Sequence, residues 1–205
     1  MKFNYFFVHL SINYFADSDE SFLGGFSPGY PLKPVKTQYI CQTHDVGPEV
    51  RHITAIEPIY SLTAGSPFIH HVLIHVCGSD YAALRAMNLN TTAHPCQAPG
   101  GEDYEIGQSP TGNGVCTSII YVSASGSGPF IMPNLAGMKL GHHRRYIVFE
   151  VHIDNPQLLK GVEITNLVKI YTTSVLRPND AGSMTVGDPA VTLPNIPIES
   201  TILPR

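Results

Sequence analysis

A ten-residue run from Phe68 to Cys77 constrains the fold of this chain most. It consists of β-branched and other apolar residues, interrupted by His70, His71 and His75. A run of this kind is typical of a buried strand. Polar side chains on a buried strand need partners, because burying them unpaired is costly. Imidazole is a common metal ligand, so a metal ion is the simplest partner for the adjacent pair His70 and His71.

The composition favours short strands joined by turns. The chain of 205 residues contains 18 Gly, 17 Pro and no Trp, and 14% of its residues are charged. Its length suits one domain or two small ones and is sufficient to bury a core. The net charge of −4 gives no basic surface for nucleic acid or for an anionic membrane. No nucleic-acid partner is therefore expected.

Further apolar segments follow with turn signals between them. The strands that we predict cover residues 38–42, 50–62, 68–77, 116–124, 130–140 (one strand or two), 145–153, 162–175 and 184–193. Residues 81–87 fit one or two helical turns, and residues 91–114 fit a long loop rich in Gly and Pro. Residues 17–34 are also rich in these residues, which predicts an irregular lead-in. The pattern as a whole predicts an all-β fold, an antiparallel β-sandwich.

The cysteines indicate an oxidising compartment. Cys41, Cys77, Cys96 and Cys116 are widely spaced and form no CxxC motif. Such spacing is unlike a zinc ribbon and fits two disulfides. Four cysteines allow three pairings, and the spacing does not choose between them. The alternative is four reduced, buried thiols in a cytosolic protein.

The N-terminus bears on the same question. Lys2 and the moderately apolar residues 3–15 precede Ala16, so residues 1–16 resemble a weak secretory signal peptide. The alternative is a truncated or wrongly assigned start. No other stretch is long enough to span a membrane. Asn90 begins an Asn-Thr-Thr glycosylation sequon, which is usable only in a secreted chain.

The histidines on strong apolar strands are the candidate metal ligands. They are His70, His71 and His152, the last on the strand predicted over residues 145–153. Neighbouring side chains on a regular strand point to opposite faces, so His70 and His71 can share a metal only if the strand bulges or twists. His71 and His75 share a face but lie about 13 Å apart, too far to bind one ion. Three imidazoles without a carboxylate or thiolate suit copper or zinc.

Several segments together resemble a known family. The pair His70-His71 stands six residues before Cys77, and the third histidine ends the segment Phe149-Glu150-Val151-His152. The other matching segments are Tyr39-Ile40-Cys41, Arg51-His52-Ile53-Thr54-Ala55-Ile56-Glu57-Pro58-Ile59, Pro95-Cys96, Cys116 with Tyr121-Val122-Ser123-Ala124, and Ala136-Gly137 to Gly141 with Arg145-Tyr146 and Asn155-Pro156. Over residues 35–198 the chain resembles the N-terminal domain of the copper type II, ascorbate-dependent monooxygenases, in particular their dopamine β-monooxygenase and tyramine β-hydroxylase branch.

The resemblance implies a jelly-roll-like antiparallel sandwich with long, disulfide-stapled loops. It implies that His70, His71 and His152 bind one electron-transfer copper. The implied disulfide pairs are Cys41–Cys96 and Cys77–Cys116. Ascorbate is expected to reduce this copper. A second copper domain, in the same protein or in another, is expected to activate O₂ and hydroxylate an unactivated C–H bond. The expected location is outside the cell or in the lumen of a secretory vesicle.

The chain departs from the family pattern at three points. Val72 follows the histidine pair where the family usually has Met, which is not a ligand of this copper. His142 and His143 occupy a turn where small residues are usual; they fit an exposed pair or, as the alternative, an extra metal site. The family's second domain, with its His-x-His motif, does not follow before Arg205. We therefore expect residues 199–205 to be a truncated tail or the start of a linker, and the chain alone not to complete hydroxylation.

Two other functions fit the same residues. One is a non-enzymatic, secreted β-sandwich that keeps the metal as a structural element. The other is a zinc site with an open fourth position that activates water. For that reaction Glu150, on the same strand face as His152, is the candidate base.

Overall fold

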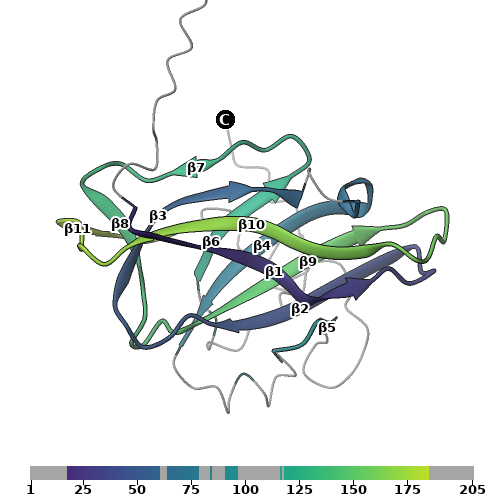
Figure 1. The fold of residues 1–205 in the computed structure, drawn as a ribbon, viewed down its shortest axis with the longest axis horizontal. Helices are drawn as coiled ribbons and strands as arrows, with labels where there is room; N and C mark the ends of the chain where they lie inside the picture. The colour runs from purple at the N-terminus through teal and green to yellow at the C-terminus, as the bar shows by residue number, and fades with distance from the viewer. Residues whose placement is uncertain are drawn as a thin grey trace, which may run out of the picture.

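Two β-sheets make up the molecule, which a computed structural model describes over residues 18–60, 64–78, 84, 91–96, 116 and 118–184 (Figure 1). The strands are β1 Glu20–Pro31, β2 Thr37–Asp45, β3 Arg51–Pro58, β4 Ile69–Cys77, β5 His94–Pro95, β6 Ser118–Ala124, β7 Phe130–Ile131, β8 Ala136–Leu140, β9 Tyr146–Asp154, β10 Glu163–Thr173 and β11 Asn179–Ala181. A short 3-10 helix, η2 Ser66–Phe68, leads into β4. The predicted all-β class is confirmed.

The two sheets pack face to face as a sandwich. The six-stranded sheet has the order β1-β10-β3-β8-β11, with β7 also paired to β3, and the five-stranded sheet has the order β5-β2-β9-β4-β6. Paired strands run antiparallel, apart from the short β11, which runs parallel to β8. In Figure 1, β1 and β10 cross in front of β4 and β9. The central pairing β2-β9-β4 of the five-stranded sheet brings the candidate ligands together.

The side chains of β9 alternate between two buried clusters, one on each face of the strand. Ile147, Phe149 and Val151 are fully buried in the core between the sheets. Tyr146 and Val148 lie on the other face, in a smaller cluster with all four cysteines. Successive side chains of a strand point to opposite faces, so this division follows directly from the sequence. The outer face of the five-stranded sheet is therefore covered rather than solvated along part of its length.

β1 corrects one prediction. Residues 17–34 do not form an irregular lead-in, because Glu20–Pro31 pairs with β10 as an edge strand. The pairing shifts register on both sides of Gly25, so the Gly and Pro residues fall where bulges and a free edge accept them. Gly24 is required by packing, since a Cβ there would overlap the ring of Phe149. Glycine and proline are unfavourable in a central strand, but an edge strand with bulges accepts them.

The remaining strand predictions agree with the structure to within a few residues inside the described ranges. The first predicted strand is longer than expected, since β2 covers Thr37–Asp45, and β5 lies within the predicted loop 91–114. The expected features at residues 1–16, 81–87 apart from Leu84, 185–193 and 199–205 lie outside the described residues, as does Asn90.

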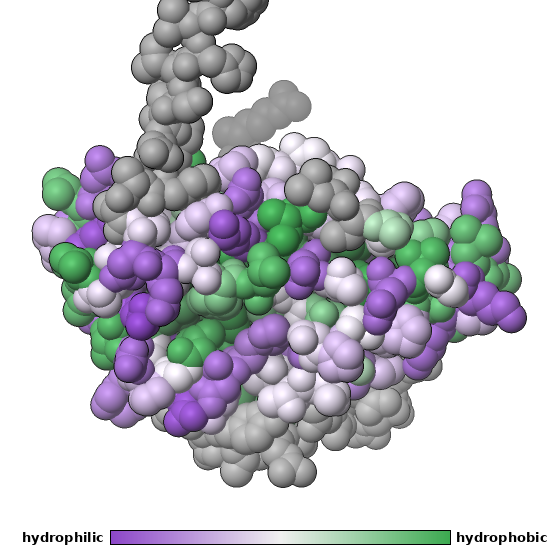
Figure 2. Space-filling view, viewed as in Figure 1, coloured by the Kyte–Doolittle hydropathy of each residue, from purple (hydrophilic) through white to green (hydrophobic). Residues whose placement is uncertain are grey.

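The surface in front of the viewer mixes hydrophilic and hydrophobic residues, with apolar side chains gathered near its middle (Figure 2). Such mixing is ordinary for a folded protein, because more than half of an accessible surface is usually apolar. Within the described residues, no helix is both long and apolar enough to cross a bilayer.

Candidate metal centre

A bulge at the start of β4 brings the two adjacent histidines to one place. Ile69 pairs with Ile153, and His71 pairs with His152, so β4 uses two residues where β9 uses one. His70 is the additional residue. A bulge bends the strand and re-aims its side chains. His70 and His71 can share a metal only if the strand bulges or twists, and the structure contains such a bulge.

The three imidazole rings face one another. One nitrogen from each of His70, His71 and His152 lies within 4.8 Å of the others, and the ring centroids are 4.7–5.3 Å apart. The Nδ1 atoms of His70 and His71 are 3.1 Å apart. Two neutral nitrogens at this distance repel unless one carries a proton or both lone pairs face a cation. Among the residues that the structure describes, no other group of three His, Cys, Asp or Glu side chains converges in this way.

Two observations, an unpartnered nitrogen and lowered pKa values, fit a metal ion at the trio. Nδ1 of His152 is buried and has no hydrogen-bond partner in the described part of the chain, which is costly unless a ligand uses its lone pair. Burial, with the neighbouring imidazole of His70, lowers the pKa of His71. Burial, with His71 and His70, also lowers the pKa of His152. Both rings are thereby held in the neutral form that binds metals.

Aromatic stacking orients the third candidate ligand, His152. Tyr39 of β2 is the register partner of His152, and the two rings stack with centroids 4.4 Å apart and planes 12° apart. Burial and the charge of Glu150 raise the pKa of Tyr39, so the phenol stays protonated beside the site. Sequence reasoning placed Tyr39 in a matching segment but missed this contact. The signal was its position two residues before Cys41, which puts both side chains on the same face of β2.

His75 takes no part in the trio, in agreement with the spacing argument. Its Nε2 donates to Oε2 of Glu150 at 3.0 Å, and its side chain is fully buried. Glu150 is thus engaged with His75, on the same face of β9 as His152.

Two disulfides border this face. Cys41 is bonded to Cys96 and Cys77 to Cys116, the pairs that the family resemblance implies. The backbone N–H of Cys96 donates to the carbonyl oxygen of Tyr39 at 2.8 Å. The first disulfide therefore holds the strand that carries the stacking ring.

The second histidine pair lies elsewhere. His142 and His143 are exposed in the turn between β8 and β9, and their rings contact each other edge to face. No third His, Cys, Asp or Glu of the described residues joins them. The turn supplies a matched pair of histidines for experiments on the trio.

The structure therefore belongs to the general class of disulfide-linked, all-β sandwiches. Its three converging imidazoles form a candidate metal centre. The family model for the N-terminal domain of copper type II ascorbate-dependent monooxygenases matches residues 27–160. The chain belongs to this family.

Similar proteins support the assignment. Tyramine beta-hydroxylase of Caenorhabditis briggsae is 28% identical over 77% of this chain and 25% of its own length. DBH-like monooxygenase protein 1 of Gallus gallus is 28% identical over 77% of this chain and 24% of its own length. Dopamine beta-hydroxylase of Equus caballus is 28% identical over 73% of this chain and 22% of its own length. The chain thus spans about a quarter of the length of these relatives.

Proposed function

We propose that this chain is the electron-transfer copper domain of an ascorbate-dependent monooxygenase, with His70, His71 and His152 as the ligands of one copper ion. The observation that carries the proposal is the convergence of these three imidazoles from two strands that are distant in the sequence. Family membership supports copper as the metal.

The surroundings of the trio, rather than its donors, favour a redox metal over a water-activating one. All three donors are imidazoles, which suit copper and zinc alike. A hydrolytic zinc site of the metalloprotease type also uses a glutamate as general base beside the metal. Glu150 is a poor base for that purpose, because it is buried against His75 and accepts a hydrogen bond from it. When bound, copper supplies one-electron chemistry, with ascorbate as the electron donor.

The chain's own residues prepare the site for this role. The bulge at His70 aims two rings from one strand, the stacking of Tyr39 fixes the plane of the third, and burial keeps His71 and His152 neutral. We expect O₂ activation and C–H hydroxylation to need a second copper domain, in the same protein or in another. On this proposal the described domain binds one copper and accepts electrons, but does not hydroxylate a substrate alone.

The two disulfides support a location outside the reducing cytosol. Disulfides persist in secreted proteins and in the secretory pathway. We infer that the domain is secreted or lies in the lumen of a secretory vesicle. Expression in an oxidising compartment should therefore be needed for full metal binding.

Copper titration of the purified protein tests the site. We expect one Cu(II) per chain, with an electron paramagnetic resonance spectrum that shows coordinated imidazole nitrogen. His70→Ala, His71→Ala and His152→Ala should each weaken binding by more than about 100-fold, beyond the loss of an outer-shell partner. His142→Ala and His143→Ala are matched controls that leave the affinity unchanged. Unchanged affinity in all three trio variants would refute the site.

Reduction by ascorbate separates the proposal from a structural metal. The copper-loaded protein should lose its Cu(II) signal on addition of ascorbate and regain it with an oxidant. A bound metal that does not respond to ascorbate, or zinc as the metal that co-purifies, would favour the structural or hydrolytic alternatives instead.

A further inference from the structure

A buried carboxylate lies next to the histidine trio without belonging to it. Glu150 is 5% exposed and precedes His152 by two residues on β9, so the two side chains share one face of the strand. In the strand pairing, Glu150 stands opposite Cys41 of β2 and Leu73 of β4. The carboxylate therefore lies between two neighbouring strands, on the face that carries the trio.

His75 is the partner of this carboxylate. Its Nε2 lies 3.0 Å from Oε2 of Glu150, and its side chain is fully buried. Nδ1 of His75 is also buried and has no hydrogen-bond partner among the residues that the structure describes. A proton on Nδ1 would be a buried donor without an acceptor, which is costly. One proton, on Nε2, satisfies this geometry, so His75 is neutral and the pair keeps the negative charge of the carboxylate.

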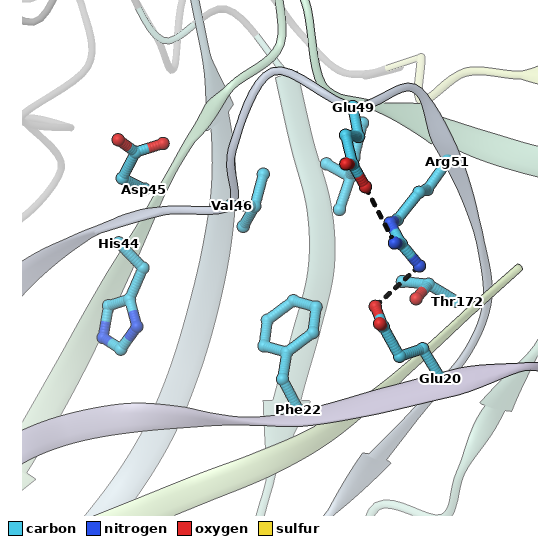
Figure 3. A pocket seen from close by; sticks show the side chains of 9 residues that line it. Glu20, Phe22, His44, Asp45, Val46, Glu49, Arg51 and Thr172 are labelled. Atoms are coloured by element: carbon cyan, nitrogen blue, oxygen red, sulfur yellow. Dashed lines mark hydrogen bonds and ion pairs between the residues drawn. The ribbon is translucent and has the colours of Figure 1, made fainter. Parts of the chain in front are cut away.

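The carboxylates around a cavity at the other end of β9 show a different arrangement (Figure 3). This cavity has a volume of about 280 Å³, and its lining residues include Glu20, Asp45, Glu49, Arg51 and Thr172. Nη1 of Arg51 lies 2.6 Å from Glu20, and Nη2 lies 3.0 Å from Glu49. Asp45 is paired with Arg145. Each of these three carboxylates has a guanidinium beside it, whereas the partner of Glu150 is a neutral ring.

The charge of Glu150 reaches both half-buried ligands. Burial and the imidazole of His70 lower the pKa of His71, and Glu150 opposes this change. Burial and the two other imidazoles lower the pKa of His152, and Asp154 and Glu150 oppose it. Asp154 is exposed on the other side of His152, where water and salt screen its charge. Glu150 is therefore the carboxylate that acts on the trio from a buried position.

A fixed negative charge stabilises the more highly charged state of a metal ion more strongly. Cu(II) carries two positive charges and Cu(I) one, so the electrostatic energy of Cu(II) beside a carboxylate is twice as large. At a separation of about 7–10 Å, as the two-residue spacing and the side-chain lengths dictate, and an effective dielectric constant of about 20, the difference is roughly 15- to 50-fold in an equilibrium constant. A charge that is fully solvated at about 7 Å contributes about threefold or less.

From these observations we propose that Glu150, held by His75, lowers the reduction potential of copper bound at the histidine trio. The inference rests on the function proposed above and adds a residue that sets the driving force for electron transfer. Glu150 is not a ligand and acts through space by its charge. A lower potential favours passage of the electron from the reduced site to a second copper, and reduces the driving force for reduction by ascorbate.

Glu150→Gln tests the charge at nearly constant shape, because the amide oxygen can still accept a hydrogen bond from His75. The Cu(II) and Cu(I) affinities of the full chain are measured by competition with chelators specific for each oxidation state, without oxygen for Cu(I). We expect the Cu(II) affinity to fall by at least about tenfold more than the Cu(I) affinity. A tenfold change corresponds to a rise of about 59 mV in the potential of a one-electron couple. A redox titration followed by the electron paramagnetic resonance signal of Cu(II) should give the same rise.

Two matched variants separate the charge from the structure. Glu150→Asp keeps the charge, and Asp154→Asn removes an exposed carboxylate at the same spacing from His152. Each should change the ratio of the Cu(II) and Cu(I) affinities by about threefold or less. Equal changes in Glu150→Gln and Glu150→Asp would show a structural role. Equal changes in Glu150→Gln and Asp154→Asn would show that burial of Glu150 is irrelevant, and either result would overturn the proposal.

A double variant keeps the test independent of the folding of Glu150→Gln, which circular dichroism checks. Glu150→Leu with His75→Phe removes both partners, so no buried polar group is left unpaired. It should change the ratio of the two affinities in the same direction and by a similar factor. His75→Gln keeps a neutral donor for Glu150 and should leave the ratio unchanged. A lower potential in His75→Gln would mean that the ring carries a positive charge, and would refute the proposal.

Failure of this proposal can be told apart from failure of the function proposed above. If copper does not bind at the trio, both are refuted. If copper binds and its affinity depends on the three histidines, but the ratio of the Cu(II) and Cu(I) affinities is unchanged in Glu150→Gln and in the double variant, the role of Glu150 alone is refuted.

Discussion

Tyr39 lies flat against His152, with ring centroids 4.4 Å apart and planes 12° apart. The two residues are directly opposite each other in the β2–β9 pairing, and His71 is opposite His152 on the other side. The ring of His152 is therefore held between two neighbouring strands. This arrangement lets the sheet, rather than a loop, define the orientation of one ligand.

Removing the ring of Tyr39 should weaken metal binding. We expect Tyr39→Leu to lower copper affinity by about tenfold, within the range for loss of a group that orients a ligand. Tyr39→Phe keeps the stacked ring and should retain the affinity. Competition titration against a chelator of known affinity measures both. Equal losses in the two variants would show that the hydroxyl, not the stacking, matters.

The sequence predicted the fold correctly where the residue pattern of a single segment is enough to identify a strand. The β-branched residues around His71 and the alternation around His152 predicted the two strands that hold the trio. The sequence showed that a bulge was needed, but not that Ile69 and His71 would flank it. Register depends on pairing with β9, which local patterns do not contain.

The parts that were missed depend on contacts between distant segments. Glu20 lies in a strand whose glycine and proline content led us to predict irregular structure. Thr172 lies opposite Glu20 on β10. The residue pattern within either segment does not indicate that Glu20 and Thr172 line the same cavity. The disulfide pairing of Cys41 with Cys96 was likewise open from spacing alone, since four cysteines allow three pairings.

Asn155 should be essential for the end of the sandwich where β9 finishes. Its side chain is fully buried; it donates to the carbonyl oxygens of Lys33 and Leu159 and accepts from the N–H of Leu159. Asn155→Ala leaves these groups without partners and should lower the free energy of unfolding by about 2–4 kcal/mol. Urea denaturation measures the change. Gln157→Ala, an exposed neighbour, should cost less than about 0.5 kcal/mol; similar losses in both would contradict the role of Asn155.

The two disulfides should contribute similarly to stability but differently to metal binding. They close loops with sequence separations of 55 and 39, worth about 4 kcal/mol each in the chain-entropy description. Replacing Cys41 and Cys96 by Ala should also lower copper affinity, because the N–H of Cys96 holds the carbonyl of Tyr39. Replacing Cys77 and Cys116 should not. Copper titration of the two folded double variants measures this difference. Equal copper affinities would show that the Cys41–Cys96 disulfide does not support the metal centre.

Acid should destabilise the metal-free domain in part through His44. Burial lowers the folded-state pKa of His44 from its usual value of 6.5, so the unfolded chain binds the proton more readily. The stabilising contribution is complete above pH 6.5 and is lost progressively as the pH falls towards the folded-state pKa. His44→Gln keeps a donor for Gly25 but cannot titrate, so it should lose less stability between about pH 7.5 and about pH 5 than the parent chain. Urea denaturation at the two pH values measures this difference. His143→Gln, which changes an exposed histidine in a turn, should behave like the parent, and an unchanged pH dependence in His44→Gln would exclude His44 as a source of acid sensitivity.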